Sequence, residues 1–474
     1  MKRALALLLL PMMLCACIGD SANSPPEVVD SHPAEGTIRI LPYEDVTFSI
    51  LATDADSDDL YIRWYIDNEF LQESEELEHS FNLEKEYEVR GVVDDGEFNV
   101  PEVWNIVVEI DTLLIMEQMS EIRMMEFTEQ VPFRMITREE LDEMLQEDFS
   151  EEENELMTEE KVLRAFHVWD EASLLENVVR MYTLGVEGYY DLIEKEFVLV
   201  DEPSKNPAVR MVTIAHELTH VLQDQNYDTL SLLETENDDE YIALTSLFEG
   251  DATYFESYYL YDMADDAIAD YFTYYNSMAD IIVAPLVSDL VMFPYIYGFK
   301  FVSKVIGDHD VDYLDTVFQD PPKTTEQILH PEKYYSGELG KTMEPIDVQD
   351  MELIDENILG ESNIFIFLDQ HLETYIAKKA AQGWNGDIYS YYENDNGHLL
   401  AFISSWDSPQ DASEFVDTYI EFIYAIPWEE YELTESYDGI YLFDSPSGFI
   451  KVQLVDDEVS IFSGTDIGLL DYVE

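Results

Sequence analysis

The spacing of apolar residues along this chain changes at about Ile110, and this change limits the folds that the chain can adopt. Before it, short segments such as 37–40 alternate apolar and polar residues, with turn signals about every ten residues. After it, apolar residues recur three and four positions apart, as in 138–146, and Thr137 and Thr158 are predicted to begin helices. The sequence therefore predicts an all-β sandwich followed by a mainly helical region.

The length and the C-terminal pattern predict a further division. A chain of 474 residues has room for more than one domain. Residues 408–426 have the pattern of a capped amphipathic helix, and the residues after them are typical of a small sheet. The predicted fold class is multidomain, with a sandwich over 37–112, a mainly α (α+β) domain over 113–350 and an α+β extension over 351–474.

The first residues have the order of an export signal. Lys2 and Arg3 precede an apolar stretch over 4–14 that is too short to span a bilayer, and Leu14-Cys15-Ala16-Cys17 ends it. This quartet resembles the lipobox of bacterial and archaeal lipoproteins. The resemblance implies that residues 1–17 are a lipoprotein signal peptide and that Cys17 becomes the lipid-modified first residue. An ordinary cleaved signal with incidental cysteines is the alternative.

The residues that follow predict a tether and an anchored protein. Residues 18–36 are polar and rich in proline, which predicts a flexible linker before the first domain. The best later candidate for a membrane span, 281–301, is interrupted by Pro285, Asp289 and Pro294. We therefore expect an exported protein that is lipid-anchored to the outer face of a membrane and does not span it.

The charge of the chain excludes some classes of partner. The formal net charge is −81, from 104 acidic and 23 basic residues, so neither nucleic acid nor an anionic lipid surface is expected as a partner. A saline or calcium-rich surrounding would screen the self-repulsion, and a highly soluble exported surface is the alternative. Both cysteines lie in the export segment, so a transition metal would need His and carboxylate ligands. The sequence indicates no oligomeric state.

The predicted sandwich carries an acidic turn. The segment over 52–60, the strand around Trp64 and Val93-Asp94-Asp95-Gly96 resemble bacterial immunoglobulin-like and PKD-type modules. Side chains at three alternating positions of the turn would offer oxygen ligands to Ca²⁺, namely Asp54, Asp56 and Asp58. A solvated acidic loop is the alternative, because the glycine and terminal glutamate of a dedicated calcium loop are missing.

One helical segment carries the pattern of a zinc site. In 211–223 the apolar residues keep helical spacing, so His216 and His220 project from one face about one turn apart. Two imidazoles in this arrangement are typical zinc ligands. Glu217 would not bind the metal but would take a proton from a zinc-bound water and return it to the leaving amine. Two structural histidines on an amphipathic helix are the alternative.

A catalytic zinc ion usually has a third protein ligand. A histidine or aspartate ligand six residues after His220 is excluded, because that position is Asn226. A glutamate on a following helix remains, and Glu249 lies in a mostly apolar helical run with Glu256 as its competitor. The two histidines with a distal Glu249-Gly250-x-Ala252 resemble the gluzincin metallopeptidases, and this resemblance implies that Glu249 is the third ligand.

A narrower resemblance covers roughly residues 115–430. The chain is similar there to a poorly characterised group of exported microbial gluzincin-like proteins. The segments that carry this resemblance are His216 to Gln225, the Glu249 segment, Gly188-Tyr189-Tyr190-Asp191, residues 325–334 and Gly383-Trp384-Asn385-Gly386-Asp387. It implies a peptidase-like domain. Thr253 stands where thermolysin-like enzymes carry an aspartate, so Asp251 or Asp224 is expected to hold the first histidine instead.

Peptide hydrolysis also needs a donor for the oxyanion. His330 is the first candidate, with Tyr189 and Tyr190 as alternatives, and a structural loop histidine is the other interpretation of His330. The predicted hairpin over 185–200 occupies the place of the strand that pairs with an extended substrate in related enzymes, and a plain packing hairpin is its alternative.

Together these residues predict a cell-surface zinc metallopeptidase that acts on peptides or proteins. One Zn²⁺ would be bound by His216, His220 and Glu249, with Glu217 as the general base. The rival function is a non-catalytic, zinc-containing surface binding or adhesion lipoprotein. A structural envelope lipoprotein with incidental histidines is a further alternative.

Overall fold

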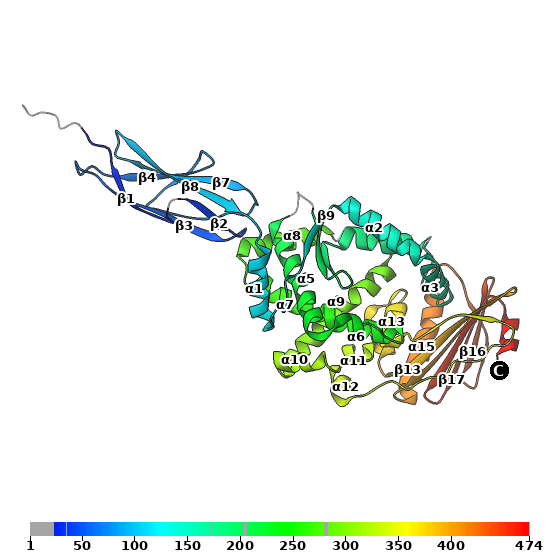
Figure 1. Cartoon of the computed structure of the whole chain (residues 1–474). Coiled ribbons are helices and arrows are strands. Elements are labelled where there is room, and N and C mark those ends of the chain that lie inside the picture. The colour runs from blue at the N-terminus through cyan, green and yellow to red at the C-terminus, as the bar shows by residue number, and fades with distance from the viewer. Residues whose placement is uncertain (1–22, 35, 172, 202–205, 279–282, 474) are drawn as a thin grey trace, which may run out of the picture. The chain divides into compact units, whose positions relative to one another are not determined.

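The computed structural model describes residues 23–34, 36–171, 173–201, 206–278 and 283–473, and it divides into two compact units (Figure 1). The first unit ends at Ile110 and the second begins at Asp111, so the boundary falls where the spacing of apolar residues changes. The predicted signal peptide and its lipidation site Cys17 lie outside the described residues. The N-terminal β-sandwich, the central helical region and the C-terminal β-rich region confirm the predicted multidomain class in outline.

The first unit is a sandwich of two sheets. One sheet has the order β1-β3-β6 and the other β2-β8-β7-β4-β5, in which β2 and β8 are parallel and the other neighbours antiparallel. The strands are β1 (Glu27–His32), β2 (Thr37–Ile40), β3 (Asp45–Thr53), β4 (Tyr61–Ile66), β5 (Glu69–Glu73), β6 (Glu76–Ser80), β7 (Glu86–Asp94) and β8 (Asn99–Val108).

Aromatic side chains fill the space between the two sheets. Trp64, Trp104 and Phe48 are fully buried, and their ring centroids lie 5.3 to 6.3 Å apart. Both indoles also satisfy their N–H groups, since Trp64 Nε1 donates to Ser74 O at 3.1 Å and Trp104 Nε1 to Pro33 O at 2.7 Å. Buried and exposed residues alternate along β8, which is the pattern from which the sandwich was predicted.

The linker prediction was wrong for part of its range. Residues 27–32 form strand β1, which pairs antiparallel with β3, so the sandwich begins within the predicted tether. The prolines at 25, 26 and 33 stand on either side of this strand and do not interrupt its pairing.

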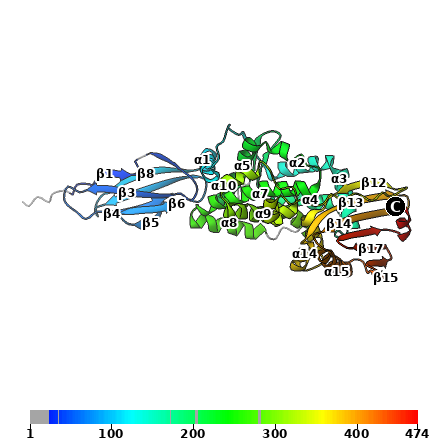
Figure 2. The ribbon, with the colours of Figure 1, turned by 90° about the horizontal axis from the view of Figure 1, so that it is seen from below.

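The central part of the second unit is helical (Figures 1 and 2). Its helices are α1 (Thr112–Arg123), α2 (Arg138–Glu151), α3 (Glu153–Ala165), α4 (Leu174–Gly185), α5 (Pro207–Tyr227), α6 (Thr229–Leu232), α7 (Asp238–Tyr261), α8 (Asp265–Met278), α9 (Pro285–Asp308), α10 (Val311–Val317), α11 (Thr325–Leu329) and α12 (Pro331–Ser336), followed by α13 (Gly360–Asp369), α14 (Thr374–Ala381) and α15 (Pro409–Ala425). A small sheet of order β10-β11-β9 lies among them, with strands β9 (Phe133–Ile136), β10 (Gly188–Asp191) and β11 (Glu196–Val200).

Helix α9 packs closely along α7. A Cβ atom added to Gly250 of α7 would lie below 3.0 Å from Gly298 of α9, and one added to Gly298 would meet the backbone of Ser246. Among the described helices, α9 alone is long and apolar enough by length and composition to cross a membrane. It nevertheless has helical neighbours along its length, since α4, α7, α10, α11, α12 and α13 all pack against it.

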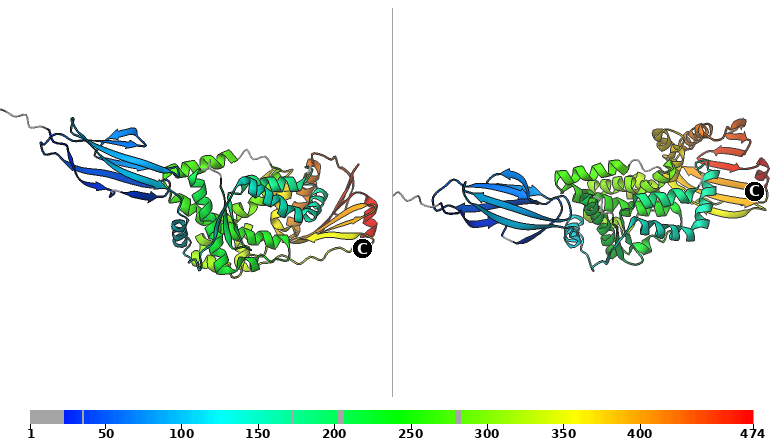
Figure 3. Two further views of the ribbon diagram at one scale, coloured as in Figure 1. Left: turned by 45° about the horizontal axis from the view of Figure 1, so that its top comes forward. Right: turned by 90° about the horizontal axis from the view of Figure 1, so that it is seen from above.

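The C-terminal part is built on one antiparallel sheet of order β12-β13-β14-β18-β17-β16-β15 (Figure 3). Its strands are β12 (Glu352–Asn357), β13 (Trp384–Asn394), β14 (Gly397–Trp406), β15 (Glu432–Tyr437), β16 (Ile440–Ser445), β17 (Gly448–Val455) and β18 (Glu458–Gly464). Helix α15 packs on one face, and its Ser408 cap confirms the predicted start of that helix.

Both faces of this sheet are covered. Leu399 and Ala401 of β14 face a cluster that includes residues from 343–351 and from the C-terminal turn Ile467–Tyr472. Phe402 points to the other face, where Phe166 from the end of α3 packs against it with ring centroids 5.9 Å apart. Phe166 also contacts Phe367 of α13, so an aromatic side chain of the helical region is part of the core of the C-terminal sheet.

The close contact of α7 and α9 at their glycines can be tested by its effect on stability. Gly298→Ala is expected to lower the free energy of unfolding of the second unit by about 1–3 kcal/mol, because the added methyl group overpacks the contact with Ser246. Gly307→Ala in the same helix is the matched control, since nothing lies within 4 Å of its added Cβ. Chemical denaturation measures both, and equal midpoints for the two variants would contradict the prediction.

Candidate metal centre

Helix α5 presents the two histidines that the sequence singled out. The helix begins with Asn206, whose side chain accepts from Ala208 N, and with Pro207 in its first turn, and it is buried along most of its length. His216 and His220 lie one turn apart, and their Nε2 atoms are 3.1 Å from each other. The predicted helix and the shared face of the two imidazoles are thus present.

Glu249 reaches the two histidines from α7. Its Oε2 lies 3.2 Å from His216 Nε2 and 3.5 Å from His220 Nε2. A tetrahedral zinc ion with bonds of about 2.0–2.1 Å holds its ligand atoms about 3.3 Å apart. The three atoms therefore fit a zinc ion, with one coordination position left for another group. Solvent reaches the site, since the Glu249 side chain is 22% exposed.

Glu256 supports His216 from behind. Its Oε2 lies 2.8 Å from His216 Nδ1, so this carboxylate accepts the Nδ1 proton, and Nε2 is the ring atom that would bind a metal. Glu256 was the competitor for the third ligand position, and the geometry gives it this supporting role instead. The prediction that Asp251 or Asp224 holds the first histidine was wrong, because both aspartates have other partners. Asp251 pairs with Arg123 and accepts from Gln223. Asp224 accepts from Tyr190 and pairs with Lys195.

Gln223 supports His220 in the same way. Its Nε2 donates to Phe248 O and to Asp251 Oδ2, both at 2.9 Å, so its Oε1 must be the atom that faces His220 Nδ1 at 2.8 Å. His220 therefore donates from Nδ1 to Gln223. Both histidines are held at Nδ1, so Nε2 is the ring atom that each would offer to a metal.

A buried ion pair holds Gln223 in turn. Asp251 is fully buried and pairs with Arg123 of α1 at 3.0 Å, and Arg123 also pairs with Asp315 at 2.8 Å. Arg123 is 1% exposed, so its buried positive charge is compensated by these two carboxylates. Helices α1, α5, α7 and α10 are thus joined by one polar network that ends at His220.

Glu217 lies beside the ligands but is not one of the three converging atoms. It is nearly buried, and burial raises the pKa of Glu217, while the two neighbouring histidines and the backbone N–H of Tyr190 act in the opposite direction. The contact with Tyr190 brings the strand β10 next to the carboxylate. A buried carboxylate with a raised pKa is suited to accepting and releasing a proton.

The two tyrosines of β10 point to opposite faces of the strand. Tyr190 faces α5, where its hydroxyl donates to Asp224 Oδ2 at 2.9 Å, and Lys195 pairs with the same carboxylate at 2.7 Å. Tyr189 faces away and packs with the cluster around Ile136 and Val198. Because successive side chains of a strand alternate, Tyr189 lies on the face of β10 away from α5, and its role as a catalytic group stays a prediction.

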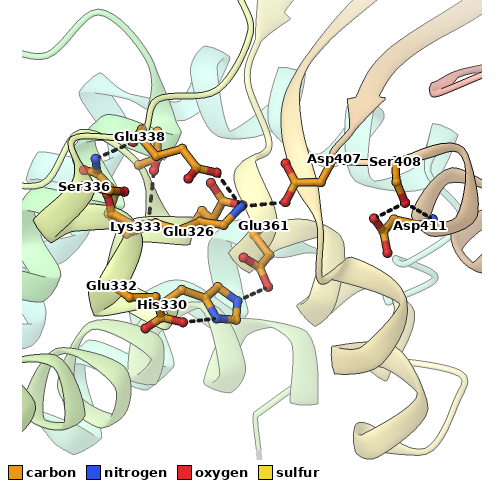
Figure 4. Close-up of polar contacts among 12 residues, drawn as sticks. Glu326, His330, Glu332, Lys333, Ser336, Glu338, Glu361, Asp407, Ser408 and Asp411 are labelled. Atoms are coloured by element: carbon orange, nitrogen blue, oxygen red, sulfur yellow. Dashed lines mark hydrogen bonds and ion pairs between the residues drawn. The ribbon is translucent and has the colours of Figure 1, made fainter.

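His330 lies in a different group of side chains (Figure 4). Its Nε2 is 2.9 Å from the buried Glu361 of α13, and Glu332 lies 4.0 Å from its Nδ1. The hydrogen bond with Glu361 is the main cause that raises the pKa of His330. The ring of His330 is thus held by Glu361, which is not part of the triad, and the role of His330 as the oxyanion donor stays a prediction.

Tyr295 of α9 is the residue that sequence reasoning missed. Its ring stacks on that of His216, with centroids 6.2 Å apart and planes inclined by 23°. The charge of Glu249, followed by burial and the charge of Glu217, raises the pKa of Tyr295 well above its usual value. No local motif could have identified it, because its position depends on the packing of α9 against α7.

The aspartates of the sandwich do not converge as the triad does. Asp54 Oδ1 accepts from Asp56 N at 2.7 Å and from Asp58 N at 3.2 Å, so it shapes the turn. The groups of described residues whose ligand atoms come together in a metal-binding arrangement do not include these three. Calcium binding at this turn stays a prediction.

The C-terminal region matches a known family. Residues 349–474 match the family model described as a domain of unknown function, DUF8575. No curated protein matches the chain. Among solved structures it is similar to fibronectin(III)-like modules of Clostridium thermocellum CbhA, with 18% identity and a TM-score of 0.16. That match covers 18% of this chain and 47% of the other, so this chain spans about half the length of that structure.

The support of His216 by Glu256 can be tested directly. Glu256→Ala is expected to weaken zinc binding about 10–100-fold, because His216 loses the acceptor that fixes its tautomer and orientation. Glu240→Ala, which removes a carboxylate from the other end of α7, is the control and should bind zinc as the wild type does. Competition with a chromophoric chelator measures the affinity, and equal affinities would exclude the supporting role.

Proposed function

We propose that the protein is a gluzincin-type zinc metallopeptidase that hydrolyses peptide bonds in peptides or proteins. We further propose that it is exported and anchored through Cys17 to the outer face of a membrane. The observation that carries the enzymatic part is the convergence of His216 Nε2, His220 Nε2 and Glu249 Oε2 at 3.1 to 3.5 Å. Imidazole nitrogens and a carboxylate oxygen are the atoms that zinc takes as ligands.

A zinc ion held by these three residues would supply Lewis acidity, which lowers the pKa of water and polarises a carbonyl oxygen. Glu217 supplies the proton transfers. Its carboxylate accepts a proton from the water whose oxygen attacks the carbonyl carbon, and it gives this proton to the amide nitrogen as the C–N bond breaks. The buried position of Glu217, next to His216 in α5, supports this role.

Tyr295 is the residue best suited to stabilise the oxyanion. Its hydroxyl is near Glu249 and Glu217, and the charges of these groups raise its pKa, so it stays protonated and can donate. A donor aimed at the oxygen on which negative charge develops lowers the barrier to hydrolysis. The stacking of Tyr295 on His216 limits its freedom of movement.

Strand β10 supports a peptide as the substrate. It stands at the edge of its sheet, so one side of its backbone has no strand partner within that sheet. Its Tyr190 backbone N–H lies at Glu217, which brings this edge to the site of proton transfer. An extended peptide paired with β10 would therefore have a backbone carbonyl close to the catalytic residues.

Metal content and the general base can be tested together. We expect one zinc ion per chain in the wild type, its loss in His216→Ala and Glu249→Ala, and its retention in Glu217→Gln. Glu217→Gln should nevertheless be inactive on a fluorogenic peptide library, because an amide cannot accept the proton. Elemental analysis measures the metal. A wild-type protein without zinc would exclude the enzyme, and zinc without hydrolysis by the wild type would favour the surface binding protein.

Tyr295→Phe separates oxyanion stabilisation from metal binding. The variant is expected to keep its zinc and its KM but to lose about 10²–10³-fold in kcat, because one hydrogen-bond donor to the transition state is removed. Tyr189→Phe is the matched control and should keep the wild-type rate, since Tyr189 faces the other side of β10. Equal rates for the two variants would assign the oxyanion to another donor.

A further inference from the structure

A second cavity lies in the helical region, away from the metal centre. It has a volume of about 350 Å³ and is bounded by α9, α11, α13 and α14. Phe301, Ile328 and Phe365 contribute buried apolar side chains to its wall. Its volume lies at the lower end of the range that small-molecule sites have in proteins.

Two lysines meet at one aromatic ring of this cavity. The Lys300 Nζ lies 4.3 Å and the Lys378 Nζ 5.1 Å from the ring centroid of Tyr297, and Lys378 Nζ is also 5.1 Å from that of Phe365. Burial and then the charge of Lys378 lower the pKa of Lys300. The chain thus holds two like charges close together at the cost of their mutual repulsion.

Lysines without a carboxylate partner are the minority among the described residues of this acidic chain. With 104 acidic residues available, most described lysines pair with a carboxylate, namely Lys85, Lys161, Lys195, Lys304, Lys323, Lys333, Lys341 and Lys379. Among the described residues, no carboxylate lies within 4.0 Å of Lys300 or Lys378. Two positive charges at the cavity therefore remain available to an anion from outside.

The one carboxylate that lines the cavity is already engaged. Glu361 bonds to His330 at 2.9 Å (Figure 4), and its side chain is only 3% exposed. It therefore does not serve as a counter-ion for the lysines. The pair of His330 and Glu361 closes one side of the cavity without adding a free negative charge.

The cavity is separate from the metal centre because the two use different faces of α9. At about 100° per residue, Tyr297, Lys300 and Phe301 lie on the side of the helix away from Tyr295. Tyr295 is the residue that stacks on His216. Helix α9 thus stands between the cavity and the metal ligands.

We propose that this cavity binds a small organic carboxylate with an apolar body. Lys300 and Lys378 would hold the carboxylate, and the walls formed by Phe301 and Phe365 would take the apolar part. Charge-assisted hydrogen bonds from two ammonium groups provide the attraction for the anion, and the surrounding aromatic groups provide the preference for an organic one.

Isothermal titration calorimetry of the full chain with benzoate, 3-phenylpropionate, benzamide and inorganic phosphate tests this proposal, in 0.15 M and 1 M salt. We expect one carboxylate per chain, no binding of the uncharged benzamide and weaker binding of phosphate. Lys300→Gln and Lys378→Gln should each weaken carboxylate binding about tenfold, through the loss of one charged donor. Lys379→Gln is the matched control, because it removes the same charge from the next residue, which pairs with Glu414.

Other outcomes would overturn the proposal. The proposal is wrong if neither carboxylate binds, or if Lys378→Gln and Lys379→Gln have equal effects on binding. It is also wrong if phosphate binds as tightly as the carboxylates, because the apolar walls would then contribute nothing to the affinity. The His216→Ala variant should bind the carboxylates as the wild type does. Loss of binding in that variant would assign the carboxylate to the metal centre, whereas the proposed peptidase activity is tested by the zinc and hydrolysis measurements alone.

Discussion

The close approach of α7 and α9 at Gly250 and Gly298 is the contact on which the centre of the second unit depends. Glu249 stands next to one of these glycines and Tyr295 one turn before the other, so the contact brings a carboxylate and a phenol to the same place. Any larger side chain at either glycine would separate the two helices. The same contact also places the opposite face of α9 against α11 and α13, where the second cavity lies.

The features that the sequence predicted well are those that local spacing determines. The sandwich strands, the β10–β11 hairpin, the helix of His216 and His220 and the Thr137 cap of α2 all follow from periods of two or 3.6 and from capping residues. Thr158 was wrong as a cap because α3 already begins at Glu153, and the Thr158 hydroxyl bonds back to Asn154 O within the helix. The strand β1 was missed because its flanking prolines are typical of linkers.

The features that the sequence predicted poorly depend on contacts between segments that are far apart in the chain. Glu256 reaches His216 Nδ1 because of how α7 lies against α5, and Tyr295 reaches the ligands because of how α9 lies against α7. His330 was chosen for its residue type within a loop, and only the packing of α13 brings Glu361 to its ring. Residue type and spacing select the candidates for a site, whereas tertiary packing determines which candidates meet.

The position of Phe166 shows that the core of the C-terminal region includes a side chain from outside it. The family match covers residues 349–474, yet this side chain, far upstream in the sequence, packs among Phe367 and Phe402 of that region. Lys333 of α12 adds a second link, because it pairs with Asp407 at 2.8 Å (Figure 4). The segment that the family model matches and the compact unit that contains it therefore have different borders, because the unit begins at Asp111. Phe166 lies outside the matched segment, yet its ring belongs to the core of the C-terminal sheet.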